Sequence, residues 1–89
     1  MKNLPQPTKA ITRVLLSLIT EPAISERQFA YNGFRDIIST LRRQYHVPIR
    51  HVDVEGQNEF GRRYIYRKHF LLTISREKAI RTYIKINQA

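Results

Sequence analysis

The chain is short and strongly basic. It has 89 residues and a mass of 10.6 kDa, which suits one domain. Its 16 Lys and Arg outnumber 7 Asp and Glu, giving a formal net charge of +9, and 42% of its residues are hydrophobic. That hydrophobic share exceeds that of a disordered basic tail. The absence of cysteine excludes disulfides and thiolate metal sites, and no apolar run approaches the roughly 20 residues of a membrane span. We therefore expect a compact cytoplasmic domain that binds a polyanion.

The first helix signal is at Thr8. Residues 1–7 contain two prolines and predict a flexible N-terminal arm, and residues 8–89 predict a single domain. From a cap at Thr8, hydrophobic residues recur at helical spacing and predict a helix to about residue 20. Leu16 lies off this stripe, so it is either a partly exposed leucine or a contact with another subunit. The stripe consists of Ile11, Val14, Leu15 and Leu18.

Two further helices are predicted around Gly33. Ser25 and Gln28 have the spacing of a capping box, which predicts a short helix from Glu26 to about residue 32. Gly33 tolerates the left-handed conformation at a helix end. A third helix should then run to about residue 46, because residues at helical spacing form an apolar face and a polar face on opposite sides. The apolar face consists of Phe34, Ile37, Ile38, Leu41 and Tyr45.

The rest of the chain predicts a β-hairpin and a last helix. Residues 49–55 read as a strand in which Ile49 is out of phase with Val52 and Val54, so either a bulge or an irregular start is expected. Turn residues fill 56–61, and residues 64–72 are aromatic and β-branched enough for the return strand. Ser75 is a candidate cap for a helix over residues 76–86. Its apolar stripe consists of Ala79, Ile80, Tyr83 and Ile84.

Four runs of the chain carry a resemblance to a known family: Val14-Leu15-Leu16 to Ile24-Ser25, Ile37 to Arg43, Val47-Pro48-Ile49, and Gly61 to Leu72. With the order of elements, they resemble the winged helix-turn-helix DNA-binding proteins, and more narrowly the small ones of phages and prophages. The resemblance covers about residues 8–72. It implies an α+β fold, a winged helix-turn-helix with a three-helix core, a β-hairpin wing and a C-terminal helix. It also implies double-stranded DNA binding by a transcriptional regulator or an excisionase-like architectural factor.

The candidate DNA contacts follow from the third helix and the hairpin. A helix in the major groove needs short polar and arginine side chains on its outer face, because arginine pairs with guanine. Asp36 is either an acceptor for cytosine or a partner of the helix dipole, and the arginines are either DNA contacts or solvated charges. The candidates are Arg27, Asn32, Arg35, Asp36, Ser39, Thr40, Arg42, Arg43 and His46 in and around the helices, and Asn58, Arg62 and Arg63 in the hairpin.

An acidic run and two tyrosines complicate the hairpin. Asp53, Glu55 and Glu59 would repel phosphate, so we expect Glu55 and Glu59 to point away from DNA or to pair with arginines across the hairpin. The alternative is that all the charges of the hairpin form cross-strand pairs on its surface. Tyr64 and Tyr66 alternate on one strand face. They are expected to pack in the core rather than to stack on bases.

Other function classes have less support. No set of catalytic side chains and no glycine-rich phosphate loop is visible, so we expect no enzyme, cofactor, bound metal or small-molecule substrate. A membrane surface is also not expected. An RNA-binding basic domain and a protein-interaction module on a winged-helix scaffold remain the alternatives. A single such module contacts little DNA, so a homodimer or cooperative assembly is plausible.

Overall fold

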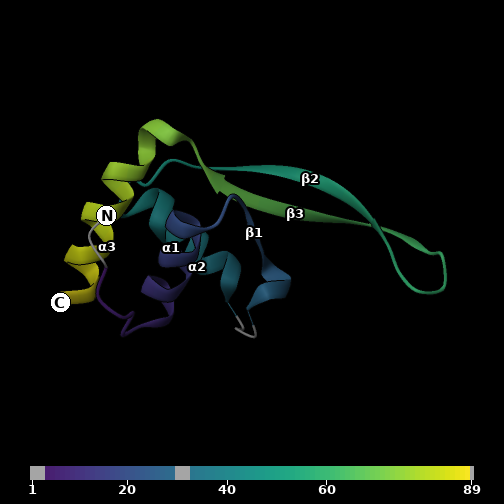
Figure 1. Ribbon diagram of the computed structural model, residues 1–89, viewed down its shortest axis with the longest axis horizontal. Helices are drawn as coiled ribbons and strands as arrows, with labels where there is room; N and C mark the ends of the chain where they lie inside the picture. The colour runs from purple at the N-terminus through teal and green to yellow at the C-terminus, as the bar shows by residue number, and fades with distance from the viewer. Residues whose placement is uncertain (1–3, 30–32, 89) are drawn as a thin grey trace.

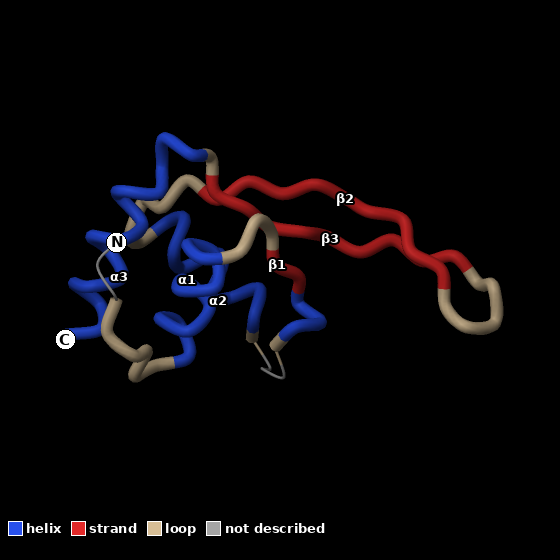
Figure 2. The backbone as a smooth tube through the Cα atoms, viewed as in Figure 1, coloured by secondary structure: helices blue, strands red, loops and turns tan. Residues whose placement is uncertain are grey.

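The computed structural model describes residues 4–29 and 33–88, which form an α+β domain (Figure 1). Three α-helices gather at one end, and a long hairpin projects from them (Figure 2). The elements are helix α1 (Ala10–Thr20), strand β1 (Ile24–Ser25), the 3₁₀ turn η1 (Glu26–Gln28), helix α2 (Phe34–Arg43), strands β2 (Ile49–Gln57) and β3 (Arg63–Leu71), the 3₁₀ turn η2 (Thr73–Ser75) and helix α3 (Arg76–Gln88).

The strands form an antiparallel sheet in the order β1-β3-β2. Strands β2 and β3 pair without interruption from Ile49 opposite Leu71 to Gln57 opposite Arg63. The expected bulge at Ile49 is therefore wrong. Ile49 is buried in the core, whereas Val52, three positions along, is half exposed on the other sheet face. The start of β2 packs against the helices, so Ile49 faces the core. Farther along, the strand projects beyond the helices, and the apolar residue Val52 lies on the opposite face without any interruption of the pairing.

The helices enclose a core to which every α-helix contributes. The α1 residues Val14, Leu15 and Leu18 are buried, which confirms most of the predicted stripe; Ile11 is only half-buried, and Leu16 packs against the edge of the core. Helix α2 contributes its own apolar face, and α3 contributes a large aromatic ring. These buried α2 and α3 residues are Phe34, Ile38, Leu41, Ala79, Tyr83 and Ile86.

The predicted second helix is wrong in its described part beyond the first turn. Among residues 26–29, Glu26–Gln28 form one 3₁₀ turn and the backbone of Phe29 is extended. The rest of the predicted helix, residues 30–32, lies outside the described residues. The backbone N–H of Ser25 donates to the Gln28 side-chain oxygen at 2.7 Å, so the predicted capping interaction exists. A single turn is enough to form this capping hydrogen bond. The ring of Phe29 then stacks on that of Phe34 at a centroid distance of 5.4 Å. Tertiary packing decides the outcome because so short a helix has little stability of its own.

Helix α2 begins as expected and ends earlier than expected. Gly33 precedes it with a φ of 97°, a conformation that glycine adopts without strain. The helix was expected to reach His46, but it ends at Arg43, and His46 itself is left-handed with a φ of 56°. The N–H of Val47 donates to the Leu41 carbonyl at 2.9 Å across this end. The left-handed residue reverses the chain two residues before Pro48, and β2 then begins at Ile49.

The N-terminal segment lies against α3. Thr8, expected to cap the first helix, instead donates from its hydroxyl and its N–H to Asn87 Oδ1 at 2.9 and 2.8 Å. The cap is Lys9, whose N–H donates to Thr12 Oγ1 at 3.1 Å. The Tyr83 hydroxyl donates to the Pro5 carbonyl, so the described part of the predicted arm is held to the domain. No described helix is long and apolar enough to cross a membrane.

Tyr83 should be a main determinant of stability, because its side chain is fully buried and its hydroxyl holds the N-terminal segment. Tyr83→Phe removes only the hydrogen bond, so the free energy of unfolding should fall by about 1 kcal/mol. Tyr83→Ala also leaves a cavity, and the loss should reach about 3–5 kcal/mol. Urea denaturation followed by circular dichroism measures both. Equal losses in the two variants would contradict the packed position of the ring.

Candidate nucleic-acid interface

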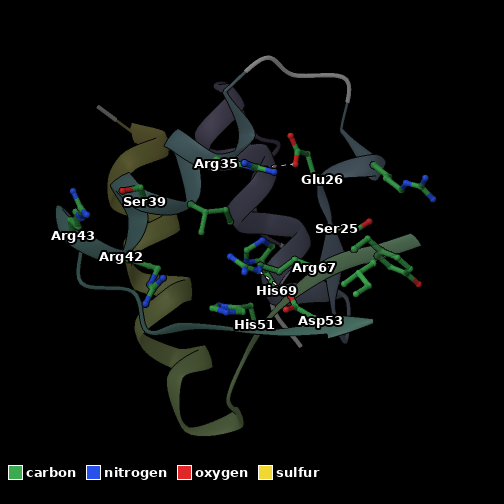
Figure 3. A pocket seen from close by; sticks show the side chains of 14 residues that line it. Ser25, Glu26, Arg35, Ser39, Arg42, Arg43, His51, Asp53, Arg67 and His69 are labelled. Carbon is green, nitrogen blue, oxygen red and sulfur yellow. Dashed lines mark hydrogen bonds and ion pairs between the residues drawn. The ribbon is translucent and has the colours of Figure 1, made fainter. Parts of the chain in front are cut away.

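An open depression of about 930 Å³ lies between α2, η1 and the base of the hairpin (Figure 3). We call it the α2–hairpin depression. Five arginines and two histidines line it, against two carboxylates. The cationic groups come from segments far apart in the sequence, which the sheet brings together. The charged and titratable lining residues are Glu26, Arg27, Arg35, Arg42, Arg43, His51, Asp53, Tyr66, Arg67 and His69.

Helix α2 forms one wall of this depression. Arg35, Ser39, Arg42 and Arg43 lie on the lining side, in agreement with the expectation that they share a surface. At 100° per residue these four positions form one arc of the helix surface, next to the buried arc of Phe34, Ile38 and Leu41. Asp36 and Thr40, expected to share that surface, do not line the depression, because the helical turn carries them past its outer edge.

The hairpin forms the opposite wall through the sheet face that carries His51 and Asp53. Their neighbours across the strands are His69 and Arg67, since the register pairs His51 with His69 and Asp53 with Arg67. Side chains of paired residues point to the same face of a sheet, so all four reach the depression. These residues, and Ser25 and Glu26 of the adjoining segment, were missed from the sequence. Alternation along each strand was visible, but the register that places the face toward α2 was not.

Ion pairs divide the arginines into two groups. Arg35 Nε lies 3.5 Å from Glu26 Oε2, and Arg67 Nε lies 3.2 Å from Asp53 Oδ1. Exposed pairs of this kind contribute about 0–1 kcal/mol, so an incoming phosphate competes with them easily. Within residues 4–29 and 33–88, Arg42 and Arg43 have no carboxylate within 4.0 Å. They are therefore the α2 cations with the least internal compensation.

The acidic run of the hairpin is largely neutralised by its neighbours. Besides the pair of Asp53 with Arg67, Glu55 Oε1 lies 3.3 Å from Arg63 Nη1. The expected cross-hairpin pairing is confirmed for these two carboxylates. It also explains why an acidic strand lies beside a cationic surface, because each carboxylate compensates one arginine of the return strand.

Arg27 braces the hairpin against η1. Its Nη1 donates to the Tyr64 hydroxyl at 2.8 Å, and its guanidinium carbon lies 4.3 Å from the centre of the Tyr64 ring. The Tyr66 ring is 5.7 Å from that of Tyr64. The expectation that both tyrosines pack in the core is wrong: they are half-buried, because the hairpin carries them beyond the helices. Gly56 leaves room for this, since a Cβ there would lie 2.6 Å from Tyr64 Cζ.

His69 occupies the junction of the sheet, α2 and the depression. Its ring centre is 5.6 Å from that of Phe34 and 6.1 Å from that of His51. Burial lowers its pKa below the usual 6.5, and the positive charges of His51, Arg67 and Arg42 lower it further, while Glu26 opposes them. The folded structure therefore favours the neutral imidazole more than the unfolded chain does.

The remaining predicted residues lie elsewhere. His46 lines a second hollow of about 600 Å³ with Arg42 and His51, beside the end of α2. Asn58, Arg62 and Arg63 lie at the far end of the hairpin, outside the depression. Asn32 falls outside the described residues.

Comparison of the chain with protein-family models, curated proteins and solved structures found no match. The function is therefore inferred from the residues and their geometry.

The lowered pKa of His69 predicts that stability falls in mild acid. As the pH drops below about 7, the unfolded chain takes up a proton at this position before the folded chain does, so the free energy of unfolding decreases until the pH reaches the folded-state pKa. Above about pH 7.5 both states are neutral and the contribution vanishes. Urea denaturation at a series of pH values below about 7.5 gives the dependence of the free energy of unfolding on pH, and its slope should be smaller for His69→Gln than for the wild type. A slope unchanged in His69→Gln contradicts the assignment.

Proposed function

We propose that this protein binds double-stranded DNA as a winged helix-turn-helix, with α2 in the major groove and the hairpin as its wing. The observation that carries the proposal is the α2–hairpin depression, in which the polar face of one helix and the base of a projecting hairpin present a shared cationic surface. The order α1, β1, η1, α2, β2, β3 supports it, with the 3₁₀ turn η1 in the described part of the segment where such folds have a helix.

The composition of the α2 wall suits a major groove. That groove admits one α-helix, whose polar face must approach base edges while its apolar face stays with the domain. Ser39 is short enough for close approach, and Arg42 and Arg43 flank it with extended guanidinium groups. A guanidinium pairs with guanine O6 and N7 or with a phosphate, so these two arginines are the leading contacts.

The charge pattern supports duplex DNA over an uncharged partner. The depression carries two α2 arginines without internal carboxylate partners, and Arg35 and Arg67 hold only exposed pairs. Phosphate contacts by such groups release counterions and supply affinity that falls with salt. The hairpin adds the tip cation Arg62, which would follow the backbone beyond the contact of α2.

The proposal extends to a regulatory role, which the small size of the domain supports. A domain of this size would act by occupying or bending a site, as a transcriptional regulator or an excisionase-like architectural factor of a phage or prophage does. Because one module buries little surface on DNA, dimers or cooperative binding would add affinity.

Titration against duplex DNA at several salt concentrations tests this proposal. Arg42→Ala and Arg43→Ala should each weaken binding by about 1–3 kcal/mol. A variant that removes a base contact should relax sequence preference, whereas one that removes a phosphate contact should lower the salt slope by about one. Arg35→Ala should have the smaller effect because Glu26 already pairs with that side chain.

Lys85→Ala and Arg81→Ala on α3 are charge-matched controls, because α3 lies at the end of the domain away from the hairpin (Figure 1). They should bind as the wild type does. Loss of binding in these variants with normal binding by Arg42→Ala and Arg43→Ala would contradict the assignment of α2. Parallel titrations with single-stranded DNA and an RNA hairpin separate duplex DNA binding from the RNA-binding alternative.

A further inference from the structure

The hairpin ends in one large exposed apolar side chain. Strands β2 and β3 pair over nine consecutive positions and extend past the helices (Figures 1 and 2). At about 3.3 Å per residue this arm is roughly 30 Å long, close to one turn of B-DNA. In the loop at its end, Phe60 is 85% exposed. The ring makes no contribution to the hydrophobic core, so packing does not explain why a phenylalanine lies at this position.

The loop holds Phe60 in place through its backbone. The side-chain oxygen of Asn58 accepts the N–H groups of Phe60 and Arg62, both at 2.9 Å. Asn58 N–H donates to the Arg62 carbonyl and Gly61 N–H to the Asn58 carbonyl, each at 3.0 Å. Gln57 Nε2 donates to the Gly61 carbonyl at 2.9 Å. Gly61 has a φ of 78°, a left-handed conformation that glycine adopts without strain in a turn. Five hydrogen bonds therefore order the loop that presents the ring, which lowers the entropy lost when the ring is buried.

The side chains around the ring are polar and carry both charges, because Glu59 precedes the ring and Arg62 follows it two residues later. Asn58, Glu59, Gly61 and Arg62 are all exposed and none is apolar, so Phe60 is an isolated ring rather than part of an apolar patch. Protein partners generally need a contiguous patch of a few hundred Å². A single phenyl group with a guanidinium two residues away matches the combination that enters a minor groove, where arginine meets strong negative potential and an apolar wedge meets base faces.

We propose that Phe60 is a wedge that inserts between two base pairs from the minor groove and bends the duplex at that step. This inference rests on the proposed duplex binding and adds to it a defined contact about 30 Å from the base of the hairpin. The ring exchanges contact with water for contact with base faces, and the two base pairs lose part of their mutual stacking. A bent duplex would then lie along the arm and against Arg62.

Base unstacking and DNA bending test the wedge directly. The probe is a duplex of about 40 base pairs, long enough for several helical turns, selected from a random-sequence pool by the wild-type protein. With 2-aminopurine placed at successive positions, wild type should raise the fluorescence at one step. Energy transfer between dyes at the duplex ends should report a bend of about 20–90°.

Phe60→Ala should abolish the local fluorescence rise and the bend, and affinity should fall by about 3–10-fold because the ring is no longer buried. Phe60→Leu should retain part of both signals, since leucine also serves as a wedge. Asn58→Ala keeps the ring and loosens the loop, so it should reduce the bend. Ile74→Ala is the matched control, because Ile74 is 88% exposed outside the hairpin.

The outcomes separate this inference from the proposed function. If the wild type selects no duplex, both are overturned. If it binds a duplex that stays straight, or if Phe60→Ala bends DNA as strongly as the wild type, the wedge is wrong and duplex binding through α2 stands. If Phe60→Ala changes the oligomeric state seen in sedimentation, the ring contacts a second copy of the chain, and the wedge is also overturned.

Discussion

The pairing of β3 with strands on both sides is the constraint on which the rest of the structure depends. Residues near Lys68 and His69 pair with β1, which leads directly into η1, and with β2, which completes the hairpin. Backbone hydrogen bonds within a sheet set both distance and direction. The base of the hairpin is therefore fixed relative to η1 and α2, and the α2–hairpin depression exists because of this. The contact of Arg27 with Tyr64 braces the arm farther out.

The fold decides which of the positive charges of the chain are compensated by a neighbouring carboxylate and which are not. Asp53 and Glu55 interrupt the basic sequence, yet in the folded hairpin each lies beside an arginine of the return strand. Within the described residues, Arg42 and Arg43 of α2 keep their charge without a carboxylate partner, whereas at the hairpin tip Arg62 lies near the acidic Glu59 in the chain. A further cation excess lies on α3, which carries Arg76, Lys78, Arg81 and Lys85 against Glu77. The α2–hairpin depression is the hollow in which five of the arginines meet.

Local patterns predicted the regular elements well. Helical spacing located α1 and α3, Gly33 located the start of α2, and alternation with turn residues located the hairpin. The failures occurred where long-range packing outweighs local preference. The capping box at Ser25 predicted a helix, but Phe29 stacks on Phe34, and a segment of this length follows its tertiary contacts. Thr8 likewise resembles a helix cap, but Asn87, nearly the whole chain away, is its partner.

The amino-acid sequence by itself determined the polar face of α2, the basic character of the chain and the presence of a β-hairpin, because these depend on periodicity and composition. Tertiary structure alone decided which residues meet on the candidate surface. His51, Arg67 and His69 join α2 through the β2–β3 register and the β1 pairing, and Tyr64 meets Arg27 because Gly56 leaves space beneath its ring. Such contacts join residues distant in the chain, and their free energy depends on register and packing that no local pattern encodes.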